Sequence, residues 1–249
     1  FSAHGDDEQL YFAGLLPLYA GQKRLNVQVV YMTDHRGETY QRTHEMLNGL
    51  WAVGVRAYPV FGWFADFIHY NMEQTYLIYE EEYDTTWATL QGFVVEQIRR
   101  FRPLVGVGHD LAGEYGHGMH QVYAELVSQA VYLTHDPNYF PSSAERYGLW
   151  DVPKTYLHLY KENPIVMDYD MPLSAFGGKT SKERESFSLF NISVSFTKSP
   201  SFAGLKGIGS EVKSICGIAE NFPRVPLTEA FNNDHICFSS SNFISLFVG

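Results

Sequence analysis

A histidine and two aspartates stand together near the start of the chain, in the stretch FSAHGDDEQL. His4 and Asp7 are three residues apart, so a turn that leads into a helix can bring both side chains to one point. Imidazole nitrogens and carboxylate oxygens are ligands that zinc accepts, at about 2.0–2.2 Å. Asp6 would then face a water molecule beside the metal. The simpler interpretation is that Asp6 and Asp7 only cap a helix, whose N-terminus favours negative charge.

A second cluster of the same residue types occupies residues 108–120, GHDLAGEYGHGMH. The cluster contains His109, Asp110, Glu114, Tyr115, His117 and His120. His117 and His120 are spaced i, i+3, which places both on one face of a helix start. Two separate segments that are both rich in metal ligands are hard to explain by capping. We interpret His109 and Asp110 as residues that either line the rim of the same site or support its ligands from outside the ligand set.

Hydrophobic periodicity indicates the elements that must position these clusters. Helices are predicted over residues 6–22, 41–53, 84–101 and 120–134, and strands over 26–33, 58–61, 104–110 and 154–160. The alternation of strands and helices predicts an α/β fold with a mostly parallel sheet. Ligands bind beyond the carboxyl ends of the strands in such sheets, and both clusters are expected there.

The two clusters in this order resemble the motifs of the LmbE-like, or PIG-L, family of zinc-dependent N-acetylglucosamine deacetylases. That family carries AHPDDE near its N-terminus and a GHPDH-type motif farther along. Here the motifs read AHGDDE, residues 3–8, and GHGMH, residues 116–120. Weaker signatures agree: YMTD at residues 31–34 resembles a strand ending of the family, and Arg42-x-x-Glu45 resembles its R-x-x-E helix. The resemblance covers residues 1 to 180.

The resemblance implies a Rossmann-like fold with flanking helices and a zinc-dependent amidohydrolase. Its substrate would be an N-acetylglucosamine-type amino sugar or glycoconjugate, from which it releases acetate. Zinc would be bound by His4, Asp7 and His120, a set that would also accept another divalent metal.

The catalytic roles also come from the resemblance. Asp6 would be the general base, and His117 would act as general acid or stabilise the oxyanion. Tyr115 would assist the oxyanion, and Arg42 would contact the substrate.

The chain departs from the family pattern inside both motifs. Gly5 replaces a proline, and Gly118-Met119 replaces Pro-Asp between the two histidines. The missing aspartate would have supported a metal ligand from outside the ligand set. The three ligand positions themselves are intact.

Composition divides the chain and excludes some functions. The formal net charge of −10 disfavours a nucleic-acid-binding surface, and no apolar run reaches the length of a membrane span. All tyrosines and tryptophans lie before residue 180, whereas serine is concentrated after it. We therefore expect a deacetylase-like domain over 1–180 and a C-terminal segment of uncertain nature over 181–249. Only three residues precede His4, so the first strand of such a fold would be largely missing. Neither the oligomeric state nor a cytoplasmic or secreted location is determined by the sequence.

Three alternatives stay open from the sequence. The first is a metal hydrolase that acts on another amide. The second is a carbohydrate-binding module that keeps the metal site without catalysis, and the third is an inactive fragment that folds poorly.

Overall fold

The structure is a computed structural model that describes residues 1–12, 14–33, 40–162, 164–184 and 236–237. The strands are β1 (Val30–Thr33), β2 (Val60–Phe64), β3 (Val105–Gly108), β4 (Lys154–Leu157), β5 (Pro172–Leu173), β6 (Lys179–Thr180) and β7 (Ile236–Cys237). The α-helices are α1 (Asp7–Leu10), α2 (Tyr40–Ala52), α3 (Met72–Tyr83), α4 (Trp87–Phe101), α5 (Gly118–Leu133) and α6 (Pro141–Tyr147). Shorter helical segments of other types are η1 (Pro17–Gln22), η3 (Glu114–Gly116) and η4 (Ser174–Phe176). Most of the expected C-terminal segment, 181–249, lies outside the described residues.

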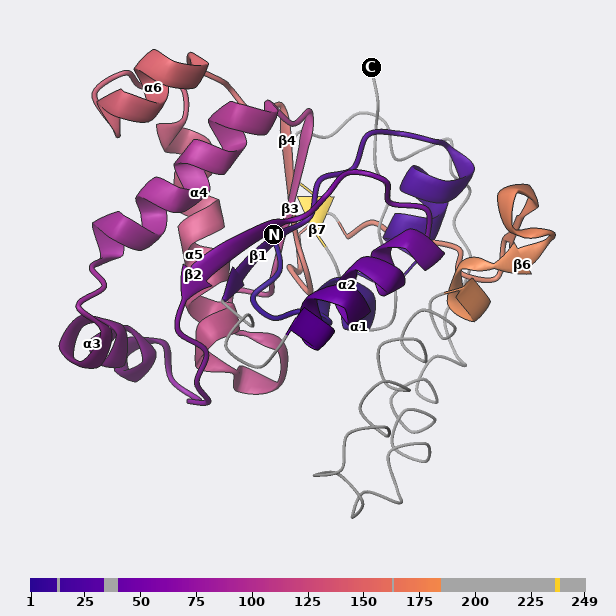
Figure 1. Ribbon diagram of the computed structural model, residues 1–249, viewed down its shortest axis with the longest axis horizontal. Helices are drawn as coiled ribbons and strands as arrows, with labels where there is room; N and C mark the ends of the chain where they lie inside the picture. The colour runs from indigo at the N-terminus through magenta and orange to yellow at the C-terminus, as the bar shows by residue number, and fades with distance from the viewer. Residues whose placement is uncertain (13, 34–39, 163, 185–235, 238–249) are drawn as a thin grey trace.

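The described strands pair in parallel, apart from the hairpin formed by β5 and β6. β1 pairs with β2, and β4 lies between β3 and β7. The first residues of the chain connect these two sheets, because the Phe1 ammonium donates to Val107 O at 2.8 Å and Ser2 N donates to Val30 O at 2.9 Å. The N-terminus therefore lies between β1 and β3 (Figure 1). The α/β class with parallel strands is confirmed. Because these strands form two short sheets, the finer Rossmann-like assignment stays a prediction.

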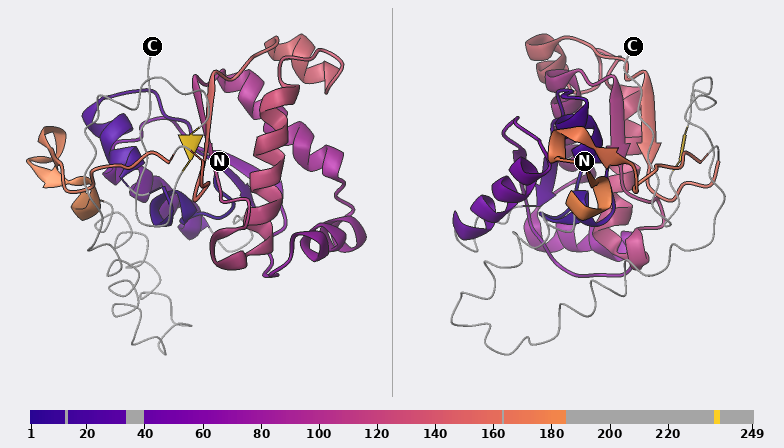
Figure 2. Two further views of the ribbon diagram at one scale, coloured as in Figure 1. Left: turned by 180° about the vertical axis from the view of Figure 1, so that it is seen from behind. Right: turned by 90° about the vertical axis from the view of Figure 1, so that its right-hand side faces the viewer.

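Helices cover both faces of β1. Val30 and Met32 contribute to a core shared with α4 and α5, whereas Tyr31 contributes to a core shared with α2 and η1. Successive side chains of a strand point to opposite faces, so a fully buried strand needs cover on both sides. Figures 1 and 2 show α4 and α5 on one side of the strands and α1 and α2 on the other.

The single helix predicted over 6–22 is wrong. α1 ends at Leu10, and regular helical turns resume in η1, a π-helix. Gly14 lies between them with φ +77°, in the left-handed region that glycine adopts without steric cost. A Cβ at this position would lie 2.5 Å from the ring of Tyr169. The backbone therefore leaves the helical path where another side chain packs against it.

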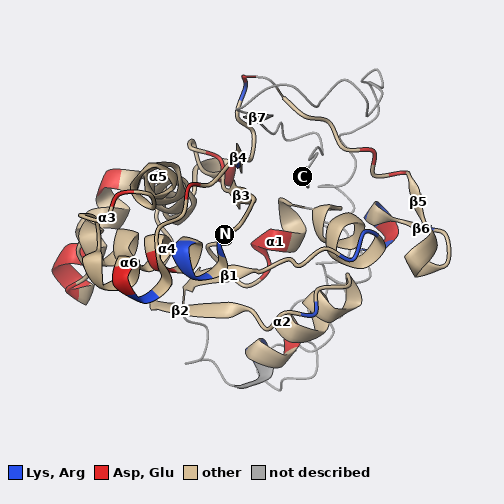
Figure 3. Cartoon of the chain, turned by 90° about the horizontal axis from the view of Figure 1, so that it is seen from above, with Lys and Arg blue, Asp and Glu red and all other residues tan. Residues whose placement is uncertain are grey.

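The other predictions differ in their details. The helices predicted over 41–53, 84–101 and 120–134 correspond to α2, α4 and α5, but β1 is shorter than the predicted strand over 26–33. α4 is capped by Thr86, whose hydroxyl accepts a hydrogen bond from Thr89 N at 3.2 Å. α3 and α6 were not predicted. α3 has a weak apolar pattern and carries three exposed glutamates at residues 80–82 (Figure 3).

In the part of the chain that the structure describes, no helix has the length and apolar character of a membrane span.

Glu8 is buried, although its position in the sequence suggests only a residue that begins a helix. Its side chain is 3% exposed and accepts hydrogen bonds from Tyr31 Oη at 2.9 Å and Gln9 Nε2 at 3.1 Å. The other carboxyl oxygen, Oε2, has no hydrogen-bond partner among the described residues. Glu8 also borders an apolar cavity of about 380 Å³. This burial raises the pKa of Glu8 to about 7, mainly by desolvation of the charged form.

We expect Glu8→Gln to flatten the pH dependence of stability between pH 4.5 and 7. The folded pKa of Glu8 is raised from 4.5 to about 7, so its stabilising contribution is present below pH 4.5 and is lost as the pH rises through 7. The shift corresponds to about 3 kcal/mol. Between these pH values the free energy of unfolding of the wild type should fall by this amount relative to that of the variant. Urea unfolding at pH 4.5 and pH 8 measures the difference. An equal difference between the two proteins at both pH values would contradict the prediction.

Candidate metal centre and active site

His4 and Asp7 are held close together by the turn between the first residues of the chain and α1. Thr33 donates from both its backbone N and its hydroxyl to Ala3 O, which fixes the residue before His4 beside the end of β1. Asp7 Oδ2 then accepts a hydrogen bond from His4 N at 2.7 Å and lies 3.0 Å from His4 Nδ1. The local i, i+3 convergence expected from the sequence is present.

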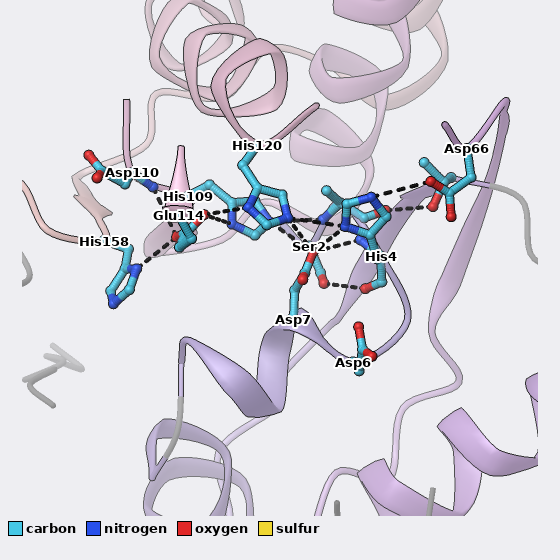
Figure 4. Close-up of polar contacts among 12 residues, drawn as sticks. Ser2, His4, Asp6, Asp7, Asp66, His109, Asp110, Glu114, His120 and His158 are labelled. Atoms are coloured by element: carbon cyan, nitrogen blue, oxygen red, sulfur yellow. Dashed lines mark hydrogen bonds and ion pairs between the residues drawn. The ribbon is translucent and has the colours of Figure 1, made fainter. Parts of the chain in front are cut away.

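His120 brings the second cluster to the first. It is fully buried in the first turn of α5. Its Nε2 lies 3.1 Å from His4 Nδ1 and 3.3 Å from Asp7 Oδ2. Three potential ligand atoms therefore converge on one point (Figure 4). Two come from His4 and Asp7, and the third comes from His120, more than a hundred positions along the chain.

The geometry of these three atoms fits a divalent metal ion. Two ligands in a tetrahedral zinc site are about 3.4 Å apart when each bond is about 2.1 Å long. The observed separations are 3.0 Å for His4–Asp7, 3.1 Å for His4–His120 and 3.3 Å for Asp7–His120. The outer nitrogen of His4, Nε2, lies 3.3 Å from Asp66 Oδ1, which leaves Nδ1 to face the cluster. The residues present thus suit a metal with nitrogen and oxygen ligands.

Two other trios of potential ligands share His120. One joins it with His4 and His117, and the other joins it with Asp7 and His109. His109 is the weaker candidate because its Nε2 already accepts a hydrogen bond from Ala3 N at 2.9 Å. A backbone N–H can only donate, so the lone pair of this nitrogen is occupied.

His117 lies beside the cluster without belonging to the closest three. Its ring centroid is 5.0 Å from that of His4 and 4.8 Å from that of His120. Its buried Nδ1 has no hydrogen-bond partner among the described residues. Burial, with the charges of His120 and His4, lowers the pKa of His117 to about 4. A neutral imidazole with a buried, unpartnered nitrogen is thus available next to the candidate metal centre.

The charges of His4 and Asp7 balance each other in the absence of a metal. Burial opposes the ionisation of Asp7, but the His4 charge and contacts with three histidines hold its pKa well below its usual range. Burial likewise favours neutral His4, yet Asp7 and Asp66 raise its pKa to about 10. A divalent cation would take over the role of the proton on His4 as the charge that balances Asp7.

Asp6 faces the side of the turn where α2 begins. Arg42 Nη2 donates to Asp6 Oδ2 at 3.4 Å, and Arg42 Nη1 donates to Glu45 Oε2 at 3.5 Å. The Asp6 side chain is 36% exposed, whereas that of Arg42 is 11% exposed. The structure thus places Arg42 against the two carboxylates, where it holds Asp6 near the cluster. Its expected contact with substrate stays a prediction.

Tyr115 lies on the outer side of the cluster. It is 68% exposed, with its ring centroid 6.0 Å from that of His117 and 5.6 Å from that of His120. Tyr70 is 67% exposed, and its ring centroid lies 6.2 Å from that of His117. Nothing in the sequence indicated that Tyr70 belongs to the site. These two exposed rings border the histidines on the solvent side.

Two further residues of the site, His158 and Asp66, escaped the sequence interpretation, and a third, His109, lies deeper than a rim position. His109 is 1% exposed, so it lies inside the site and not at its rim. His158 follows β4, far from both motifs, and its Nδ1 lies 2.7 Å from Glu114 Oε1. Asp66 follows β2 and contacts His4. The sequence offers no spacing signal for His158 or Asp66, because both reach the site only through the order of the strands.

No family model and no curated protein matches the chain. Solved structures with a similar fold include N,N'-diacetylchitobiose deacetylase from Pyrococcus horikoshii, with a TM-score of 0.59 and 16% identity over 86% of this chain and 74% of that chain. The conserved protein TT1542 from Thermus thermophilus aligns with a TM-score of 0.50 and 18% identity over 80% of each chain. GalB, the 4-carboxy-2-hydroxymuconate hydratase from Pseudomonas putida KT2440, aligns with a TM-score of 0.50 and 16% identity over 90% of this chain and 95% of that chain.

These identities are low, so the likeness shows a shared fold and leaves the activity open. The fold carries both a deacetylase and a hydratase, and the activity of this chain must therefore be argued from its own site.

Proposed function

We propose that this protein is a zinc-dependent hydrolase that removes the acetyl group from an N-acetylglucosamine-type amino sugar or glycoconjugate. The observation that carries the proposal is the convergence of His4 Nδ1, Asp7 Oδ2 and His120 Nε2, with separations of 3.0–3.3 Å. Histidine nitrogens disfavour magnesium and calcium, which prefer oxygen ligands. Three protein ligands leave a coordination position open, which is typical of a catalytic zinc and not of a structural one.

His4, Asp7 and His120 would hold the metal. When bound, zinc would polarise the acetamide carbonyl and make a neighbouring water molecule more acidic. Asp6 would accept the proton of the attacking water, because it is partly exposed beside the ligands and is held by Arg42. This general base keeps its position through the contact with the Arg42 guanidinium.

The charge that develops on the carbonyl oxygen needs a hydrogen-bond donor. His117 lies beside the ligands and the exposed Tyr115 lies next to it, with ring centroids 6.0 Å apart. We expect either side chain to stabilise the oxyanion. Because the pKa of His117 is lowered to about 4, the leaving amine would take its proton from Asp6, which the attacking water has protonated, and the products are acetate and a free amine.

The substrate class is supported by two observations. One solved structure with this fold is a deacetylase of diacetylchitobiose, a sugar that carries acetamide groups. The exposed rings of Tyr70 and Tyr115 border the histidines, and aromatic rings can pack against the apolar face of a sugar.

A second candidate function is the metal-assisted addition of water to a double bond. The shared fold of the hydratase GalB motivates it. The residues that would activate water for an amide would also serve this reaction, so only the substrate separates the two.

The proposal predicts acetate release from N-acetylglucosamine derivatives by the zinc-loaded protein. A coupled acetate assay on a panel of N-acetylated sugars, other acetamides and unsaturated carboxylic acids tests it. Activity should be lost with a chelator and restored by zinc, because the site needs its metal. Turnover of unsaturated acids alone would instead favour a hydratase, and zinc binding without turnover would favour a carbohydrate-binding module.

A further inference from the structure

Glu114 connects three histidines inside the protein. Its Oε2 lies 2.8 Å from His109 Nδ1 and 2.9 Å from His120 Nδ1. Its Oε1 lies 2.7 Å from His158 Nδ1 and accepts a hydrogen bond from Asp110 N at 3.2 Å. Glu114 itself is 3% exposed. Figure 4 shows this carboxylate between His158 on one side and the stacked rings of His109 and His120 on the other.

We propose that Glu114 is the positioning residue of the metal centre, which orients His120 so that its Nε2 faces the metal. The inference rests on the proposed function, and it adds a residue to which neither the sequence motifs nor the similar folds assign a role. It also accounts for Met119, a fully buried methionine at the position where the family pattern has a supporting aspartate. Glu114 supplies a carboxylate to His120 from the preceding turn.

The backbone around Glu114 is shaped to turn this side chain inward. Gly113, Tyr115 and Gly116 have φ values of +69°, +45° and +78°, so the chain reverses sharply on both sides of Glu114. A Cβ on Gly113 would lie 2.5 Å from His117 O, which requires glycine there. Tyr115 consequently points to solvent while Glu114 points into the protein. A left-handed conformation at a tyrosine is uncommon and indicates that the turn is determined by its surroundings.

The contact with Glu114 determines which nitrogen of His120 is available. A carboxylate beside Nδ1 favours the tautomer that carries its proton there, which leaves the lone pair of Nε2 for a metal. Nε2 lies 3.3 Å from Asp7 Oδ2 and 3.1 Å from His4 Nδ1, as a ligand should. The same kind of contact holds His4, whose outer nitrogen faces Asp66 at 3.3 Å.

His109 connects Glu114 to the segment that carries His4. Its Nε2 accepts from Ala3 N, so in the neutral ring Nδ1 carries the proton and donates to Glu114 Oε2. The rings of His109 and His120 are stacked, with centroids 4.3 Å apart and planes 4° apart. Glu114 Oε2 therefore contacts both rings: it pairs with His109 Nδ1 in a hydrogen bond and lies at ion-pair distance from His120 Nδ1, outside hydrogen-bond alignment. Through these contacts Glu114 links the residue before His4 to the first turn of α5.

The test compares zinc affinity in Glu114→Gln and in the wild type. An amide keeps the size of the side chain but places an N–H donor against imidazole nitrogens, which favours the tautomer of His120 that has no lone pair at Nε2. Mutation of a supporting partner of a metal ligand typically weakens affinity about 10–100-fold. We expect a rise in the zinc Kd of this size, measured by competition with a chromophoric chelator, with circular dichroism unchanged.

Two further variants make the result specific. Glu125→Gln changes the same residue type on α5, where Glu125 accepts from Gln129 Nε2 at 2.7 Å, and its zinc Kd should equal that of the wild type. Glu114→Asp keeps the charge on a shorter side chain and should give a Kd between those of the wild type and Glu114→Gln. If Glu114→Gln does not fold, the comparison of Glu114→Asp with the wild type decides.

The possible outcomes separate this inference from the proposed function. A wild type that binds no zinc would overturn both. A wild type that binds zinc and releases acetate, together with an unchanged Kd in Glu114→Gln or, if that variant does not fold, in Glu114→Asp, would overturn the positioning role alone. In the expected case kcat also falls while KM for the sugar stays the same, because Glu114 is buried away from the substrate.

Discussion

Asp6→Asn should slow acetate release strongly while zinc remains bound. The asparagine keeps the shape of the side chain and an oxygen that can accept the hydrogen bond from Arg42. Its amide cannot take a proton from water. General-base catalysis typically contributes about 10²–10⁴-fold in rate, and we expect kcat to fall within this range. Asp6 lies outside the three closest ligand atoms, so the zinc content of the purified variant should match that of the wild type.

The control for this variant is Asp151→Asn, an exposed aspartate before β4. It makes the same chemical change away from the cluster and should leave both rate and zinc content unchanged. Full activity in Asp6→Asn would remove Asp6 from the mechanism. Joint loss of zinc and activity would instead make Asp6 a ligand.

His4→Ala should remove zinc binding, and activity with it. The side chain supplies one of three converging ligand atoms, and its loss leaves Asp7 and His120 without the third. The zinc Kd should rise by more than the about 10–100-fold typical of a supporting residue. Competition with a chelator measures the Kd, and metal analysis after dialysis gives the bound zinc directly.

This variant also discriminates between the proposed ligands, His4, Asp7 and His120, and an overlapping group in which His109 replaces His4. If the metal were held by Asp7, His109 and His120, His4→Ala would still bind it. Retained zinc in His4→Ala would therefore overturn the proposed centre in favour of that group. His135→Ala, which changes an exposed histidine, is the matched control and should bind zinc as the wild type does.

The similar folds sharpen the choice of experiments. A deacetylase and a hydratase share this arrangement of strands and helices at 16% identity to this chain, which shows that the fold positions a site without deciding its substrate. The variants at Asp6, His4 and Glu114 test water activation and metal binding, which both reactions would use. The substrate panel is therefore the experiment that separates the two functions.

The sequence by itself predicted what depends on neighbouring residues. Helical periodicity located α2, α4 and α5, and the run rich in β-branched residues over 26–33 located β1, because these patterns follow from local geometry. Within each motif, the i, i+3 spacing anticipated that His4 would meet Asp7 and that His117 would lie near His120. The resemblance to a deacetylase family also rests on such short segments.

Only the tertiary structure decided how the two motifs meet and what supports them. His4 and His120 come within 3.1 Å because residues 1–3 lie between β1 and β3, a pairing that no local pattern encodes. Glu114 joins His109, His120 and His158 because the ends of the paired strands β3 and β4 lie beside the first turn of α5, and its inward orientation depends on a turn with three residues of positive φ. The break at Gly14 was likewise missed, because it depends on the packing of Tyr169, which lies far along the chain. Spacing within a segment determines which side chains can act together, whereas contacts between distant segments determine which of them do.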